Sequence, residues 1–169
     1  MELRLARYQD RDLILKFYKD GSNKLKSEGI DQWQGKKVPN LDNFKDLINN
    51  KEIFVLEDAG DVVATCVIKK YDYDYDNNMH GSWITDGNFV AIHRVATGRE
   101  FRKKGYGRTL LELCEDYAKE NNIKSIRIDT HRDNRSMQSL IKKLGYNYCG
   151  IVYIGGTDER LAFEKVLED

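Results

Sequence analysis

The chain has 169 residues, of which 40% are hydrophobic and 33% are charged, with 28 basic and 28 acidic side chains. This profile is typical of one globular domain and excludes an intrinsically disordered protein. Because basic and acidic residues balance, we expect no nucleic acid as partner, since proteins that bind one usually carry a basic excess. No run approaches the ~18 apolar residues of a membrane helix, so we expect no membrane partner and a cytoplasmic protein.

The first half of the chain alternates short predicted strands and helices. The expected elements are a strand ending near residue 8, a helix that begins after Asp10 or Asp12 and ends near Gly29, a loop at 31–40, a short helix at 41–48, and strands at 53–57 and 62–69. The segment Asp58-Ala59-Gly60-Asp61 between the last two strands is typical of a hairpin turn. Residues 71–87 are polar and aromatic and predict an excursion between strands.

The second half alternates strands with longer helices. The expected elements are a strand at 89–97, a helix at 104–121, a strand at 126–130, a helix capped by Asn134 and closed by Gly145, and strands at 146–154 and 161–166. A hairpin-rich first half followed by this order predicts an α/β or α+β fold, with a mixed sheet and helices on both faces.

Cysteines and histidines are scattered along the chain. They are Cys66, Cys114, Cys149, His80, His93 and His131. With no C-x-x-C pair and an odd number of cysteines, we expect buried thiols in a reducing compartment. The same scatter predicts no metal site.

The segment from Val95 to Leu111 reads VATGREFRKKGYGRTLL. A strand ends, a basic turn with two glycines follows, and an amphipathic helix begins at once. Free backbone N–H groups and the macrodipole make a helix N-terminus an anion site, and glycine lets the backbone approach a phosphate closely. The turn is surrounded by cations: Arg99, Arg102, Lys103, Lys104 and Arg108. The segment therefore predicts a site for a diphosphate or a phosphorylated ligand.

Two other phosphate motifs do not fit this segment. The string G-x-x-x-x-G-K-[ST] does not occur, and in the pattern G-x-G-x-x-G Leu110 stands at the third glycine. A solvated basic turn without a ligand stays as the other interpretation of the segment taken alone.

The string Arg102-Lys103-Lys104-Gly105-Tyr106-Gly107 resembles the [QR]-x-x-G-x-[GA] signature of the GNAT superfamily of N-acetyltransferases. Asn134, ten residues before Leu144-Gly145-Tyr146, is similar to a second segment of that family. The order of predicted elements also agrees, so the resemblance covers most of the chain. It implies a single N-acetyltransferase domain over residues 1–169 with a mixed, mostly antiparallel sheet of six to seven strands and helices on both faces.

The resemblance implies direct transfer of an acetyl group from acetyl-CoA, as donor cosubstrate, to a primary amine of a small molecule or a peptide, without a metal. It assigns CoA binding to Val95, Ala96, Thr97, Arg102, Lys103, Lys104, Gly105, Tyr106, Gly107, Arg108 and Asn134. The backbone of Val95 and Thr97 would pair with the pantetheine arm, and amides from Lys103 to Arg108 would hold the pyrophosphate. A backbone N–H near Val95 would stabilise the oxyanion.

Two positions depart from the family pattern. Ile141 stands where many members have a tyrosine as general acid, and Ala91 stands where some have a glutamate base. His93, two residues further along the strand, should project from the same face as Ala91, which makes it our candidate catalytic base. The other interpretation of His93 is a structural residue with its hydrogen bonds satisfied.

The acceptor amine is not named by the sequence. The resemblance places its pocket at the early helices and loops, where Trp33 and Tyr73 are our candidate substrate-binding residues; Trp33 could equally fill the core. Three aspartates alternate with tyrosines and would favour a cationic amine, unless they are simply solvated: Asp72, Asp74 and Asp76. The missing tyrosine and glutamate support a second function, a non-catalytic protein that binds or senses acyl-CoA. A homodimer stays open, because dimers are common in the family.

Overall fold

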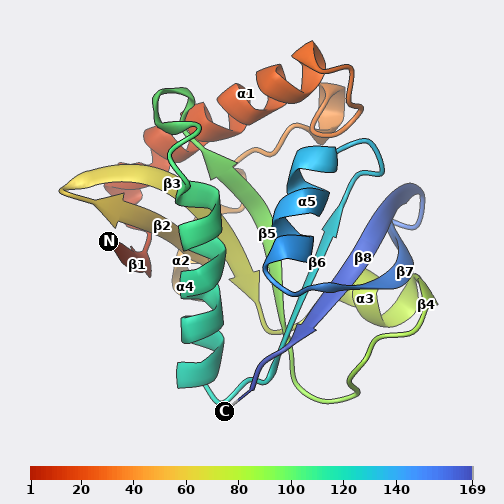
Figure 1. The fold of residues 1–169 in the computed structure, drawn as a ribbon. Coiled ribbons are helices and arrows are strands. Elements are labelled where there is room, and N and C mark those ends of the chain that lie inside the picture. Colours follow the sequence, from red (N-terminus) through yellow and green to blue (C-terminus); the bar gives the residue numbers. More distant parts are fainter. Residues whose placement is uncertain (169) are drawn as a thin grey trace. The chain divides into compact units, whose positions relative to one another are not determined.

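The computed structural model describes residues 1–168, which cluster into two compact units. Unit 1 consists of Met1–Ile68 and Arg94–Cys114, and unit 2 consists of Lys69–His93 and the chain from Glu115 on. Strand β5 (Val90–Thr97) and helix α4 (Tyr106–Glu120) each begin in one unit and end in the other. Each unit is described by itself, with the labels of Figure 1.

Unit 1 is built on an antiparallel group of strands. Its elements are β1 (Glu2–Leu5), η1 (Tyr8–Asp10), α1 (Arg11–Ser27), η2 (Gly35–Lys37), α2 (Phe44–Asn49), β2 (Ile53–Asp58), β3 (Asp61–Lys69) and η3 (Arg99–Phe101), with the second half of β5 and the start of α4. Strand β2 pairs antiparallel with β1 on one side and with β3 on the other. Ala59 and Gly60 have φ of 51° and 89°, so the predicted hairpin turn is confirmed.

Helices cover both faces of the strands in unit 1. On one face, Phe17 of α1 and Phe44 of α2 pack in one core cluster with Ile53 of β2. On the other face, the Sγ atoms of Cys66 in β3 and Cys114 in α4 lie 3.8 Å apart. This two-sided packing follows from the alternation of side chains along β2 and β3.

Unit 2 contains the parallel strand pair. Its elements are α3 (Tyr73–Asn77), β4 (Met79–Gly81), the first half of β5, β6 (Ser125–Thr130), α5 (Arg135–Lys143), β7 (Asn147–Ile154) and β8 (Asp158–Val166). Strands β5 and β6 pair in parallel, whereas the pairs β6–β8, β8–β7 and β7–β4 are antiparallel. Helix α3 lies beside β4 and β7 (Figure 1). The predicted fold class is confirmed, but residues 1–168 contain eight strands rather than the expected six to seven.

The predicted excursion at 71–87 contains regular structure that the sequence analysis missed. Asp72 caps α3, because its side chain accepts a hydrogen bond from the backbone N–H of Tyr75. Strand β4 pairs with β7 where Gly81 faces Gly150, and a Cβ on either glycine would collide with the opposite backbone. Two glycines with positive φ therefore permit the close pairing that produces the additional strand.

The cysteine prediction is confirmed for two of the three residues. Cys66 and Cys114 are fully buried, and all three thiols are free. Cys149 is only partly buried, which corrects our expectation. The reason is its place in β7, where the register of pairing with β8 shifts between Tyr148 and Gly150.

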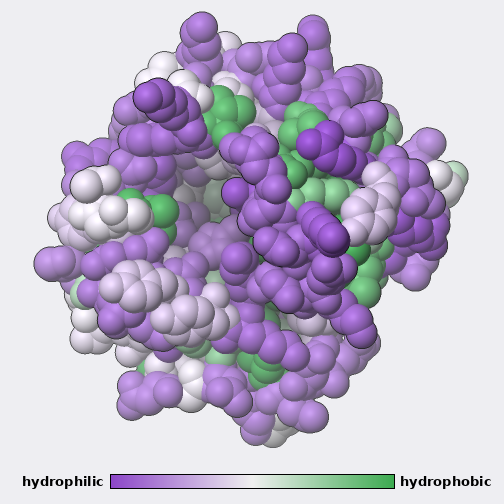
Figure 2. Space-filling view, turned by 180° about the vertical axis from the view of Figure 1, so that it is seen from behind, coloured by the Kyte–Doolittle hydropathy of each residue, from purple (hydrophilic) through white to green (hydrophobic). Residues whose placement is uncertain are grey.

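Figure 2 shows a face on which hydrophilic residues predominate and hydrophobic residues form small separate patches. Among residues 1–168, no helix combines the length and the apolar character needed to cross a membrane.

Gly98→Ala should destabilise the chain through steric overlap alone, because the φ of Gly98 is an ordinary −60°. A Cβ there would lie 2.6 Å from Cε1 of buried Phe17 and 2.9 Å from Cδ2 of Phe101. We expect a loss of about 1–3 kcal/mol in the free energy of unfolding, measured by urea denaturation. Gly87→Ala is the matched control, since nothing lies within 4 Å of its Cβ position. Equal stability of the two variants would contradict this packing.

Asn134→Ala should remove the cap of α5. The Oδ1 atom of Asn134 accepts a hydrogen bond from the Met137 N–H at 3.2 Å, as the sequence predicted. We expect a loss of about 1 kcal/mol in the free energy of unfolding, while Asn134→Asp, which keeps the acceptor, should stay close to wild type. If the aspartate variant loses as much as the alanine variant, the cap is not what stabilises this end of α5.

Candidate functional site

The end of β5 departs from regular strand geometry at Arg94. Arg94 has a φ of +53°, its guanidinium lies 5.9 Å from the ring centre of Tyr18, and its Nη1 donates to the carbonyl oxygen of Asn40 at 3.1 Å. Directly after this irregularity the backbone passes Val95 and Thr97, which are partly exposed on either side of buried Ala96. The predicted pantetheine-binding residues therefore follow a local distortion of the strand. Such distortions concentrate at functional sites.

The turn between β5 and α4 has left-handed backbone at two residues. Lys103 has a φ of 62° and Gly105 has a φ of 78°. Because a helix cannot pass through such residues, α4 begins at Tyr106 rather than at the predicted residue 104. Its first backbone hydrogen bond runs from the Thr109 N–H to the Gly105 carbonyl oxygen, at 3.1 Å. The amides of residues 106–108 precede that bond, which is the arrangement of an anion-binding helix terminus.

Helix α1 holds this turn from one side. The Nη2 atom of Arg102 donates to the carbonyl oxygen of Asp20 at 2.6 Å, and the backbone N–H of Arg99 donates to Oδ2 of Asp20 at 3.1 Å. Lys16 bridges Asp20 and Glu100, at 3.0 Å and 2.7 Å. The side chain of Arg102, one of the predicted CoA-binding residues, is therefore engaged in fixing the turn, whereas Lys103 and Lys104 are exposed.

Two contacts fix the first turn of α4. The hydroxyl of Tyr106 donates to Oδ2 of Asp58 at 2.6 Å, and this hydrogen bond raises the pKa of Tyr106. Arg108 pairs with Glu112 one turn further along, with 2.8 Å between Nε and Oε1. Backbone amides, a preformed left-handed turn and exposed cations together form the anion cradle, by which we mean residues 102–108.

Asn134 lies in unit 2, where the oxygen of its side-chain amide caps helix α5. Its Oδ1 accepts the backbone N–H of Met137 at 3.2 Å. Gly145 closes α5 with a φ of 93°, as predicted.

His93 lies between two carboxylates in unit 2. Its Nε2 is 2.6 Å from Oδ2 of Asp72, and its Nδ1 is 3.9 Å from Oδ2 of Asp129. Ala91 pairs with Arg127 in the β5–β6 register, and the alternation along both strands puts His93 and Asp129 on that same face, as we expected for His93. The sequence analysis missed Asp129, although its alternation with buried Ile126 and Ile128 could have assigned it to this face.

The two carboxylates have opposite pKa shifts. Burial of Asp72 opposes its ionisation, but the hydrogen bond and charge of His93 and the N–H of Tyr75 outweigh it and lower the pKa of Asp72. Burial raises the pKa of Asp129, and neither His93 nor the Tyr75 hydroxyl, which donates to Oδ2 at 2.5 Å, offsets it. At neutral pH Asp72 is therefore the firmly ionised partner of His93.

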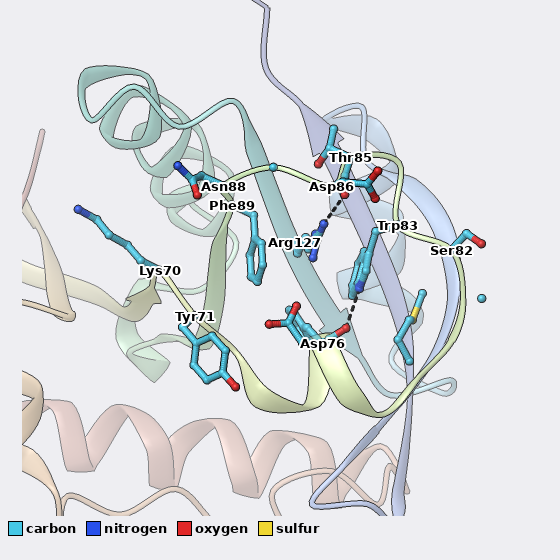
Figure 3. A pocket seen from close by; sticks show the side chains of 14 residues that line it. Lys70, Tyr71, Asp76, Ser82, Trp83, Thr85, Asp86, Asn88, Phe89 and Arg127 are labelled. Carbon is cyan, nitrogen blue, oxygen red and sulfur yellow. Dashed lines mark hydrogen bonds between the residues drawn. The ribbon is translucent and has the colours of Figure 1, made fainter.

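A cavity of about 600 Å³ opens in unit 2 (Figure 3). Figure 3 shows the guanidinium of Arg127 between the rings of Phe89 and Trp83, whose centres lie 4.0 Å and 4.5 Å from it. The charge of Arg127 is matched by fully buried Glu164, with 3.3 Å between Nε and Oε2. Tyr75 also lines the cavity and connects its wall to Asp129. This gives the cavity an aromatic wall beside the carboxylates around His93.

The remaining predicted residues have the following surroundings. Trp33 is partly buried against the core of unit 1, with its ring centre 5.8 Å from that of Tyr18, as expected for a core residue. Tyr73 is 63% exposed, and its neighbours Tyr71 and Tyr75, rather than Tyr73 itself, line the cavity. Substrate-binding roles for Trp33 and Tyr73 stay predictions.

The other histidines do not join this cluster of groups. His80 is exposed, with its ring edge-on to Tyr153. His131 accepts the Asp133 N–H at Nδ1, at 3.0 Å, and so shapes the loop before α5. Within residues 1–168, no group of three or more His, Cys, Asp or Glu side chains is placed to hold a metal ion.

Comparisons with known proteins identify acetyltransferases that are similar to this chain. The N-acetyltransferase YesJ of Bacillus subtilis (strain 168), described as uncharacterized, is 24% identical over 148 residues, which are 86% of this chain and 81% of that protein. A GNAT-family acetyltransferase structure from Streptococcus agalactiae 2603 is 30% identical with a TM-score of 0.87, covering 99% of this chain and 96% of that one. The yncA protein of Salmonella typhimurium, a putative acetyltransferase solved with acetyl-CoA, is 18% identical with a TM-score of 0.69, covering 100% and 95%.

The family model described as the acetyltransferase (GNAT) family matches residues 17–146. That range includes β5, the anion cradle, α4 and α5. The chain therefore belongs to the acetyltransferase (GNAT) family, and its general activity is acetyl transfer.

Proposed function

We propose that the chain is an N-acetyltransferase that uses acetyl-CoA as donor and a primary amine of a small molecule or peptide as acceptor. The observation that carries this proposal is the anion cradle, where left-handed backbone at Lys103 and Gly105 stands directly before the amides that open α4. A diphosphate suits that combination of amides and exposed cations. The acetyl-CoA named with the Salmonella structure supports the same donor.

The residues around the anion cradle divide the binding of acetyl-CoA among them. Amides from Lys103 to Arg108 hold the pyrophosphate, with Lys103 and Lys104 as exposed cations. Gly105 fits this role, because it is exposed and nothing stands within 4 Å of the Cβ that it lacks, so a ligand can take that space. The backbone of Val95 and Thr97 pairs with the pantetheine arm. Asn134 stays a proposed CoA-binding residue on the family resemblance alone.

Strand β5 supplies the residues proposed to accept the amine proton and to stabilise the oxyanion. Acetyl-CoA, when bound, supplies an activated acetyl group on a thiol leaving group. The N–H of Val95 stabilises the oxyanion that forms when the amine attacks. His93 is the general base that takes the proton of the amine. Ile141 is fully buried and apolar, so it excludes a proton donor at that family position.

A second candidate function is a protein that binds acyl-CoA without turnover. It is favoured by Ile141 and Ala91, which are apolar and fully buried where family members carry an acid and a base. Release of the CoA thiol in the presence of mixed amines separates the two functions, because only the transferase releases it.

Gly105→Glu should abolish binding of acetyl-CoA, because it puts a carboxylate where the pyrophosphate lies. We expect affinity to fall at least tenfold, about 1.4 kcal/mol, in calorimetric titration with acetyl-CoA. Gly156→Glu is a matched control: Gly156 is exposed, has a φ of 80° against 78° at Gly105, and has nothing within 4 Å of its Cβ position. The control adds the same charge and the same backbone strain at a residue outside the range 102–108.

Equal loss of affinity in both variants would mean that Gly105→Glu acts through strain or net charge, and the anion cradle would lose its assignment. If the wild-type chain does not bind acetyl-CoA, the proposal that acetyl-CoA is its donor is wrong.

A further inference from the structure

Asp72 is held rigidly through both of its carboxylate oxygens. Oδ1 accepts the backbone N–H of Tyr75 at 3.1 Å, which caps α3, and Oδ2 lies 2.6 Å from Nε2 of His93. Its side chain is 12% exposed. A carboxylate fixed by a helix cap holds the His93 ring in one orientation, since neither oxygen is free to rotate away.

The ionisation of Asp72 determines which nitrogen of His93 carries the proton. Its pKa is lowered, with burial outweighed by the His93 hydrogen bond and the Tyr75 N–H, so at neutral pH Asp72 only accepts hydrogen bonds. The 2.6 Å contact therefore requires an N–H at Nε2 of His93. In the neutral ring the lone pair is then at Nδ1.

Nδ1 faces a second carboxylate that is not bound to it. It lies 3.9 Å from Oδ2 of Asp129, which accepts the hydroxyl of Tyr75 at 2.5 Å. The positive charge of Arg160 also acts on Asp129. The side chains of His93 and Asp129 are 23% and 11% exposed, so the pair is reached from the His93 side, where Nδ1 and Oδ2 can both accept from a group that carries N–H bonds.

We propose that Asp72 is a positioning residue that fixes Nδ1 of His93 as the nitrogen that deprotonates the acceptor, and that the acceptor is an amine bound as its ammonium ion beside Asp129. This inference rests on the proposed function and names the acid–base residues and the acceptor form of that same site. An N–H bond of the ammonium breaks, its electron pair stays on the amine nitrogen, and the proton binds the Nδ1 lone pair. The ionised carboxylate of Asp72 stabilises the imidazolium that results.

The first test needs no substrate and reads the tautomer of His93 by ¹⁵N-edited NMR of the ligand-free chain above pH 8. The chain has three histidines, so His93→Gln identifies the signals of residue 93. We expect the Nε2–H tautomer in the wild type. In Asp72→Asn the amide oxygen keeps the cap of α3 and the NH2 group faces Nε2, which should move the proton to Nδ1. An Nδ1–H tautomer in the wild type, or no change in Asp72→Asn, would overturn the inference.

The second test follows kinetics with acetyl-CoA and a panel of cadaverine, tyramine and the peptide Ala-Ala-Ala, read as release of the CoA thiol. We expect Asp72→Asn to lower kcat by about 10²- to 10⁴-fold with KM of the amine changed less than threefold. The double variant with His93→Gln should be no slower than His93→Gln alone. Asp129→Asn should raise KM of the amine. Asp116→Asn, an exposed acid on α4, is the control for loss of one charge.

The two tests separate the failure of this inference from the failure of the proposed function. If the wild type shows the Nε2–H tautomer but turns over none of the amines and binds no acetyl-CoA, the transferase is lost while Asp72 still positions His93. If the wild type acetylates an amine and Asp72→Asn keeps its kcat within twofold, the transferase stands and the role of Asp72 is wrong.

Discussion

The residue at which α4 begins determines which backbone amides after β5 are available to an anion. Left-handed backbone at Lys103 and Gly105 prevents the helix from starting earlier, so its first hydrogen bond closes only between Thr109 and Gly105. A lysine at positive φ is strained by roughly 1 kcal/mol or more, and it persists only where neighbouring contacts hold it. Arg102 on Asp20 and Tyr106 on Asp58 supply those contacts on either side of the turn. The amides are therefore fixed in place before any anion arrives, which lowers the cost of binding.

Buried charges on one face of unit 2 fall into two kinds. Glu164 accepts hydrogen bonds from side chains of β6 and from the loop before β5, and these outweigh its burial and lower its pKa. It is a satisfied structural anion that compensates Arg127. Asp129, on the neighbouring strand, has a raised pKa because its contacts with Tyr75 and His93 do not offset burial. Buried carboxylates with opposite shifts divide into those that stabilise the fold and those that can exchange a proton.

Features that depend on local sequence could be predicted, and those that depend on distant contacts could not. The hairpin at Ala59-Gly60, the Asn134 cap and the Gly145 terminus each follow from the backbone preference of one or two residues. By contrast, Asp72 and His93 are 21 residues apart, so their 2.6 Å contact has no signal in the local sequence. The hydrogen bond from Arg102 to the carbonyl oxygen of Asp20 joins residues 82 positions apart, and nothing in the local sequence indicates it. The motif thus predicted where a ligand should bind, but not which cations remain exposed to it.

The packing around Ala91 explains why this position does not carry a carboxylate in this chain. Ala91 is fully buried and pairs with Arg127, whose charge Glu164 already compensates. A second carboxylate at that position would be a buried charge without a cation of its own, which is among the costliest substitutions a core can receive. Two residues further along the same face, His93 is partly exposed and has Asp72 to hold it. At this position a titratable side chain is exposed to solvent and is also held in place by a hydrogen bond. The neighbouring ion pair therefore disfavours a carboxylate at position 91 and is compatible with the proposed imidazole base at position 93.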